Sequence, residues 1–242
     1  MDIVKIKERL SFLQEAEKLK SVLRSAHTST GRTESTAEHS WRLSLMAMIF
    51  EDELAGVDML RVLKMCLVHD LGEAIHGDIP AVERDLHPDK GEQEKDALLH
   101  LTRALGEKQR EEILSLWQEY ECAASPEARA VKALDKLETI LQHNQGINPP
   151  DFNYAFNLTY GQEYTSTHPL FMQLREILNE DTRQKLPGAH NSDLPEGGCA
   201  RCHHWQASRF HFIQSNLVRS IKSFLMNSPR GIYTKLQNST GR

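Results

Sequence analysis

The chain has 242 residues, of which 39% are hydrophobic and 26% charged, as in globular proteins that bury a sizeable core. This composition excludes a disordered or fibrous chain. The amino terminus has charges scattered among its apolar positions, unlike a signal peptide, and no run is long enough to span a membrane. We therefore predict a cytoplasmic protein without a membrane span, whose four cysteines are reduced thiols.

The net charge of −5 is unevenly distributed along the chain. Of the 29 Lys and Arg, seven lie in residues 197–242, a segment without Asp or Glu, so residues 1–196 hold the other 22 and all 34 acidic side chains. Such an acidic body has no global attraction for a nucleic-acid polymer. A phosphate that it binds must therefore meet local positive charge or a metal ion.

Apolar residues recur at spacings of three and four along the body, without sustained period-two alternation, and this pattern predicts an all-α fold, a compact helical bundle. The first helix is expected over residues 3–24, with Leu10 and Leu13 toward its buried side. Strong start signals are a capping box (STAE) at residues 35–38 and Ser125 before Pro126. The later helices are expected over residues 35–49, 58–73, 93–105, 108–121, 125–146 and 169–183.

A Pro- and Gly-rich linker follows Lys185, so we divide the chain into a helical domain at residues 1–185 and a basic appendage at residues 186–242. The appendage contains the cluster CARCHH, which includes the haem-attachment pattern C-x-x-C-H. Haem attachment normally requires export, and a zinc site here lacks a convincing fourth ligand, so we favour an incidental cluster. The apolar stripe at residues 210–225 is expected to pack on the body or to be poorly ordered rather than to lie on a membrane.

Five ionisable side chains crowd into the stretch VHDLGEAIHGD, directly after an apolar run. Each is expensive to bury unless it is paired, ligated or protonated. If the third helix continues through this stretch, His69, Asp70 and Glu73 can face one side of it. Two adjacent side chains can then bind a metal ion while Glu73 holds a water. The alternative is a helix end with solvated charges, and His76 is expected to be background.

His39 and Asp135 lie on predicted helix faces that otherwise carry apolar residues. A metal ion is one way to keep a buried carboxylate ionised. Together with His69 and Asp70 they form a nitrogen and oxygen set whose two carboxylates match a divalent charge. Taken singly, His39 fits a core histidine bonded to backbone, and Asp135 fits a partner of a nearby basic side chain.

The order of His39, the His69-Asp70 doublet and Asp135 resembles the H…HD…D signature of the HD-domain metal-dependent phosphohydrolases. Three longer blocks, RTESTAEHSWRLSLMAM, VHDLGEAIHGDIP and LWQEYECAASPEARAVKALDKLE, resemble the HD-domain 5′-deoxynucleotidases more closely. The resemblance implies an all-helical homodimer with one divalent cation (Mn, Co, Fe, Zn or Mg) on these four residues. It also implies hydrolysis of deoxyribonucleoside 5′-monophosphates to deoxyribonucleoside and phosphate.

The same resemblance assigns roles to three further residues. Glu73 stands at the position of the catalytic carboxylate, Asp78 at that of a second acidic residue near the substrate, and Arg24 at that of the arginine that meets the phosphate. These roles are physically consistent, because a carboxylate can deprotonate water and a forked guanidinium suits phosphoryl oxygens. Taken alone, Asp78 also fits a turn and Arg24 a helix C-terminus. The chain departs from the family after Arg24, where His27 is the nearest ring and the family often has Trp.

Two rival functions remain beside 5′-deoxynucleotidase activity. One is another HD activity, either a cyclic-nucleotide phosphodiesterase or a dNTP triphosphohydrolase. A single Arg near the site favours a monophosphate, because a triphosphate demands more cations. The other rival is a non-catalytic nucleotide-binding protein, against which the intact Glu73 and the four ligand positions argue.

Overall fold

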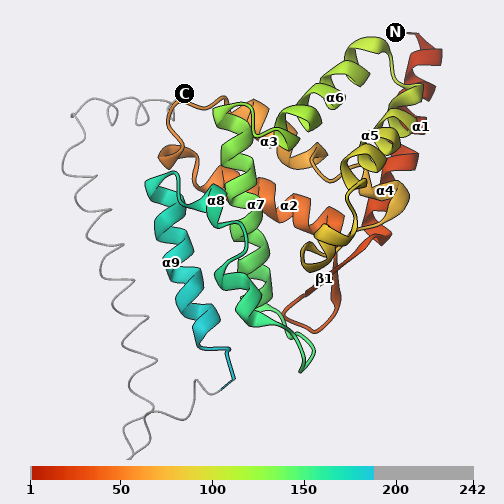
Figure 1. Cartoon of the computed structure of the whole chain (residues 1–242). Helices are drawn as coiled ribbons and strands as arrows, with labels where there is room; N and C mark the ends of the chain where they lie inside the picture. The colour runs from red at the N-terminus through yellow and green to blue at the C-terminus, as the bar shows by residue number, and fades with distance from the viewer. Residues whose placement is uncertain (1, 188–242) are drawn as a thin grey trace, which may run out of the picture. The chain divides into compact units, whose positions relative to one another are not determined.

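The structure, a computed structural model, describes residues 2–187 of the chain. These residues form helices and one small two-stranded sheet, which confirms the predicted all-α fold (Figure 1). No helix among them combines the length and apolar character needed to cross a membrane. Apart from Leu186 and Pro187, the predicted appendage at residues 186–242 lies outside the described residues, and so does its CARCHH cluster.

Short connections join the helices and strands of the described residues. The α-helices are α1 (Ile3–Ala16), α2 (Thr36–Ile49), α3 (Met59–Val68), α4 (Glu73–His76), α5 (Lys90–Leu101), α6 (Glu107–Glu121), α7 (Pro126–Gln145), α8 (Gln162–Thr165) and α9 (Pro169–Arg183). The 3-10 helices are η1 (Glu17–Ser21), η2 (Glu51–Glu53), η3 (Ala81–Leu86), η4 (Thr102–Ala104) and η5 (Tyr154–Leu158). The strands β1 (Leu23–His27) and β2 (Thr33–Ser35) pair in antiparallel fashion.

Two predicted helix starts are confirmed by their caps. Ser35 accepts a hydrogen bond from the backbone of Glu38, whose side chain accepts one in return from the Ser35 backbone, so the capping box of α2 is complete. Ser125 caps α7 by accepting from the backbone N–H of Ala128, and Pro126 occupies the first helical position.

The predicted first helix is too long. In the structure α1 ends at Ala16, and η1 and then β1 follow it. Arg24 therefore lies on a strand rather than at a helix end. The residues of this hairpin are rich in Ser and Thr, which have weak helix propensities. The expected buried face is also wrong, because Leu10 is 53% exposed and Leu13 is 60% exposed.

The third helix ends earlier than predicted, at Val68, and α4 begins only at Glu73. Between them the backbone makes tighter bonds, from Leu71 N to the Val68 oxygen and from Glu73 N to the Asp70 oxygen, both 3.1 Å. A Cβ on Gly72 would lie 2.9 Å from the backbone oxygen of Glu94 on α5, so only glycine allows this close approach. His69 and Asp70 are therefore presented by a turn rather than by one helix face.

Helix α7 lies at the centre of the described residues and contacts α2, α3 and α9 (Figure 1). Most of its apolar side chains, among them Val131, Leu134 and Leu137, are buried in the main core. Because nearly all of α7 is enclosed, its polar residues are buried too, including Asp135 and Glu138. The fold therefore brings ionisable side chains into its interior on the helix that crosses its centre.

Candidate active site

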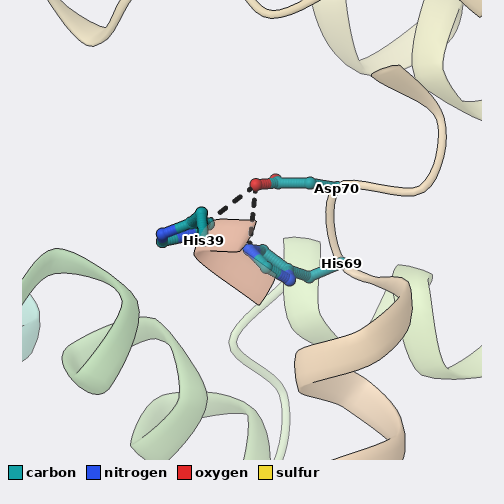
Figure 2. Close-up of side chains that lie close together, drawn as sticks. All are labelled: His39, His69 and Asp70. Atoms are coloured by element: carbon teal, nitrogen blue, oxygen red, sulfur yellow. Dashed lines mark ion pairs between the residues drawn. The ribbon is translucent and has the colours of Figure 1, made fainter. Parts of the chain in front are cut away.

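Three of the four predicted metal ligands converge in one place. His39 lies in α2, and His69 and Asp70 lie in the turn after α3. Their ligand atoms all lie within 4.8 Å of one another. Figure 2 shows the Asp70 carboxylate pointing toward both imidazole rings, and its Oδ2 is 3.0 Å from His69 Nε2 and 3.9 Å from His39 Nε2.

Asp135, the fourth predicted ligand, borders this group from α7. Its Oδ1 lies 3.1 Å from His39 Nε2. Its other oxygen accepts hydrogen bonds from Tyr120 Oη at 2.7 Å and from Lys136 Nζ at 2.8 Å. Asp135 is thus fixed with one oxygen toward His39 and the other held by the protein.

The two histidines present unpartnered nitrogen atoms to this centre. Both side chains are buried, and the Nε2 atoms of His39 and His69 have no hydrogen-bond partner among the described residues. His69 Nδ1 donates to the backbone oxygen of Cys66 at 2.9 Å, which leaves the Nε2 lone pair free. Two orphaned imidazole nitrogens beside two carboxylates are the donor set of a divalent transition-metal site, so these residues fit such an ion.

Glu138 was not assigned a role from the sequence, although it lies on the central helix next to the site. It is fully buried and is bonded to His39 Nδ1, while Arg42 Nε donates to its other oxygen at 2.6 Å. Burial opposes protonation of His39, but the Glu138 and Asp135 carboxylates outweigh this and raise the pKa of His39 to about 10. The sequence signal was the spacing, since Glu138 follows Asp135 by three residues and shares its helix face.

A cavity of about 310 Å³ opens onto this centre. It is lined by Asp70 and Asp135 and also by the predicted catalytic and substrate residues Glu73, Asp78 and Arg24. The structure therefore brings together residues that are separated by more than a hundred positions in the sequence.

Glu73 is nearly fully buried at the start of α4. Thr36 Oγ1 donates to its Oε2 at 3.1 Å, and Lys90 Nζ lies 3.5 Å from its Oε1. Burial and the charges of Asp70 and Asp78 raise the pKa of Glu73 to about 9. A cation beside Asp70 would offset these negative charges and favour the ionised form of Glu73.

Arg24 extends from β1 into the same cavity. Its Nη1 lies 3.5 Å from Asp70 Oδ2, its Nε lies 3.5 Å from Glu34 Oε2, and its Nη2 donates to Thr139 Oγ1 at 3.2 Å. Burial disfavours the charged form, but Asp78 and Asp70 raise the pKa of Arg24 further above its ordinary value. Arg24 is thus a permanent positive charge beside the candidate metal ligands.

Two lysines that the sequence did not single out also line the cavity. Lys136 donates to Asp135, and Lys90 pairs with Glu73 and, at 3.1 Å, with Glu94. Lys90 lies in a segment that resembled a polar link, so nothing in the pattern marked it. Arg24 also lies beside carboxylates, but both of its ion pairs are 3.5 Å long, whereas each lysine has a shorter one, so Arg24 is the principal cation for a phosphate.

The family model described as HD domain matches residues 16–175 of the chain. The chain belongs to the HD-domain family. A zebrafish protein named 5′-deoxynucleotidase HDDC2 is 36% identical over 183 residues, which is 73% of this chain and 89% of that protein. A Dictyostelium discoideum protein of the same name is 34% identical over 189 residues, 72% of this chain and 98% of that protein.

The HD-domain fold is also found in a solved structure. The crystal structure of a predicted metal-dependent phosphohydrolase from Magnetospirillum magnetotacticum matches with a TM-score of 0.67 and 29% identity. The match covers 75% of this chain and 94% of that one. The predicted membership of this HD-domain family, with the 5′-deoxynucleotidases among its relatives, is thereby confirmed.

Proposed function

We propose that this HD-domain protein is a metal-dependent 5′-deoxynucleotidase, which hydrolyses deoxyribonucleoside 5′-monophosphates to deoxyribonucleoside and phosphate. One observation carries the proposal: the Nε2 atoms of His39 and His69, which make no hydrogen bond among the described residues, converge on Asp70, and Asp70 lines a cavity together with Glu73 and Arg24. The names and the 34–36% identity of the two relatives described above support the same activity.

We assign the ligands of a divalent cation (Mn, Co, Fe, Zn or Mg) to His39, His69, Asp70 and Asp135. When bound there, the ion would supply polarisation of a phosphoryl oxygen and a lowered pKa of water. The chain fixes these ligands through its own contacts, because a backbone oxygen, Tyr120 and Glu138 hold their other polar atoms.

The remaining residues would act on water and phosphate. Glu73 accepts a proton from the attacking water, and Thr36 and Lys90 hold its carboxylate in place. The water oxygen bonds to phosphorus while the bond from phosphorus to the 5′-oxygen breaks, and the leaving 5′-oxygen takes up the proton that Glu73 accepted. Arg24 offsets the negative charge of the phosphoryl oxygens. Asp78 lines the same cavity, and we assign it the role of the second acidic residue near the substrate.

The charge of the cavity favours a monophosphate over a triphosphate. Among the described residues that line it, Arg24 is the only arginine, and both lysines there are paired with carboxylates. Seven acidic side chains also line it, namely Asp70, Glu73, Asp78, Glu94, Glu121, Asp135 and Asp151. A longer polyphosphate would bring more negative charge than these cations can offset.

A substrate panel tests this proposal. Phosphate release is measured from deoxyribonucleoside 5′-monophosphates, their 3′-isomers, cyclic nucleotides and dNTPs, with several divalent metals. We expect release from the 5′-monophosphates and little from the others. Turnover of only cyclic nucleotides or dNTPs would contradict the proposal, and so would an absence of turnover with every metal.

The proposal also includes a cytoplasmic homodimer in which residues 186–242 are a separate appendage. Helix α2 supports self-association, because Trp41, Met48 and Ile49 lie on one of its sides and are 64%, 54% and 69% exposed. A second copy of the chain would cover this apolar stripe. Sedimentation equilibrium should give the mass of a dimer, and a monomer mass at micromolar concentration would contradict this part.

A further inference from the structure

Three aromatic rings form one side of the cavity. Phe152, Phe156 and Tyr160 line it, and all three are half-buried. We refer to these three residues as the aromatic wall. His27, the nearest ring after Arg24 in the sequence, is not among the described residues that line the cavity.

The aromatic wall runs along α7 away from the candidate metal ligands. Its near end is Tyr160, whose ring lies 5.1 Å from Lys136 Nζ, next to Asp135. Its far end is Phe152, whose ring packs edge-on against His143 at 4.8 Å. From Asp135 to His143 the helix advances by eight residues, or about 12 Å at 1.5 Å per residue. The rings thus extend from the hydrolytic centre toward the end of the cavity that Phe152 lines, where Asp151 is also among the lining residues.

The fold holds this wall in position. Buried Arg175 on α9 donates to the backbone oxygens of Asn157 at 2.8 Å and Tyr160 at 2.6 Å. His143 Nδ1 donates to the Asn157 side-chain oxygen at 2.8 Å. Burial lowers the pKa of His143 to about 4, so this histidine adds no charge at neutral pH. The rings are therefore fixed before a ligand arrives.

We infer that the aromatic wall is the nucleobase platform of the site, on which Phe152 and Phe156 stack against the base while Arg24 meets the phosphate. This inference rests on the proposed function, because it names the part of the substrate that the far end of the cavity binds. A nucleoside monophosphate carries its phosphate at one end and a flat aromatic group at the other, and the cavity has Arg24 beside Asp70 at one end and the Phe152 ring at the other. Stacking tolerates any base, since every base has a π-face, so purine and pyrimidine nucleotides should both bind.

Replacing one ring of the wall tests the inference in the full-length protein. Phe156→Leu keeps apolar volume but removes the π-face, whereas Phe156→Tyr keeps the ring. For each variant, kcat/KM is measured for deoxyadenosine 5′-monophosphate and for 2-deoxyribose 5-phosphate, which lacks a base. Phe156→Leu should lower the nucleotide value at least about fivefold, the change that corresponds to about 1 kcal/mol of stacking. The value for the sugar phosphate should not change, and Phe156→Tyr should behave as wild type.

Phe50→Leu is the matched control, because it is the same substitution at a half-buried phenylalanine that does not line the cavity. It should leave the ratio of the two kcat/KM values unchanged. An unchanged ratio in Phe156→Leu, or an equal fall in Phe50→Leu, would overturn the inference.

Calorimetric binding of deoxyadenosine 5′-monophosphate separates this inference from the proposed function. If the wild-type protein binds the nucleotide but does not hydrolyse it, the proposed function is wrong. The binding measurement still tests whether the aromatic wall binds the base. Weaker binding only in Phe156→Leu would support the wall, and equal binding by Phe156→Leu and wild type would overturn it.

Discussion

Glu138 is bonded to the ring nitrogen of His39 that faces away from Asp70, and this bond fixes which nitrogen His39 presents. Such carboxylate–histidine pairs orient metal ligands and raise their basicity. We predict that Glu138→Gln weakens binding of a divalent metal about 10- to 100-fold. Titration calorimetry of the metal-free protein measures this directly.

The matched control for this change is Glu112→Gln, the same substitution at an exposed carboxylate that pairs with exposed Lys64 and does not line the cavity. It should leave metal affinity unchanged. Equal metal affinity of Glu138→Gln and wild type would show that Glu138 has no positioning role.

Glu73 is predicted to handle the water rather than to hold the ion. Glu73→Gln keeps the shape of the side chain and its contact with Thr36 but removes the proton acceptor. We expect metal content as in wild type and a fall in kcat of about 10²- to 10⁴-fold. Metal analysis and single-turnover kinetics distinguish the two roles, with Glu92→Gln on the exposed side of α5 as control. If Glu73→Gln instead lost bound metal but kept the wild-type activity per bound metal ion, Glu73 would be a metal ligand.

At the residue scale, the sequence predicted the ionisable residues that meet at the site but not those that support them. His39, His69, Asp70 and Asp135 stood out because ionisable groups on apolar faces are costly. Supporting residues such as Lys90 gave no such signal, because a polar residue in a polar segment is ordinary. Their contacts depend on tertiary packing, which a single sequence does not display.

At the scale of elements, the end of α7 packs closely against strand β1. A Cβ on Gly146 would lie 2.1 Å from the backbone oxygen of His27, which also accepts a hydrogen bond from Gln142 at 2.6 Å. We predict that Gly146→Ala forces β1 to shift and lowers the free energy of unfolding by about 1–3 kcal/mol. Because β1 carries Arg24, the KM for the nucleotide should rise as well.

Urea unfolding measures the effect, with Gly91→Ala as the matched control. A Cβ on Gly91 would meet nothing within 4 Å, so this change on α5 should be neutral or stabilising by up to about 1 kcal/mol. Equal stability of Gly146→Ala and Gly91→Ala would mean that the α7–β1 junction adapts without strain.

Helix starts were predictable from local chemistry, and helix ends were less so. Ser35 and Ser125 marked their helices because capping depends on neighbouring backbone groups. The end of α3 at Val68 depends instead on the close approach of Gly72 to α5, a contact between distant segments. The predicted single helix face for His69, Asp70 and Glu73 therefore failed, although a turn brings the same residues to the site.

At the scale of the whole molecule, every residue that we assign to the site lies within residues 2–187. The HD-domain match ends at residue 175, before the predicted appendage begins. We therefore predict that removing residues 188–242 leaves kcat/KM for a deoxyribonucleoside 5′-monophosphate within about twofold of the full chain. The truncated and full-length proteins are compared at equal metal content. A loss beyond tenfold would show that the appendage contributes to the site or to the dimer.

Metal dependence of phosphate release is the central claim, and removal followed by restoration of the metal tests it most directly. Full-length wild type and Asp70→Ala are stripped with chelator, dialysed and titrated with Mn or Co, while phosphate release from a deoxyribonucleoside 5′-monophosphate is followed. The account predicts that stripping abolishes release and that added metal restores it in wild type but not in Asp70→Ala. Undiminished release from the stripped wild type, or full restoration in Asp70→Ala, would contradict it.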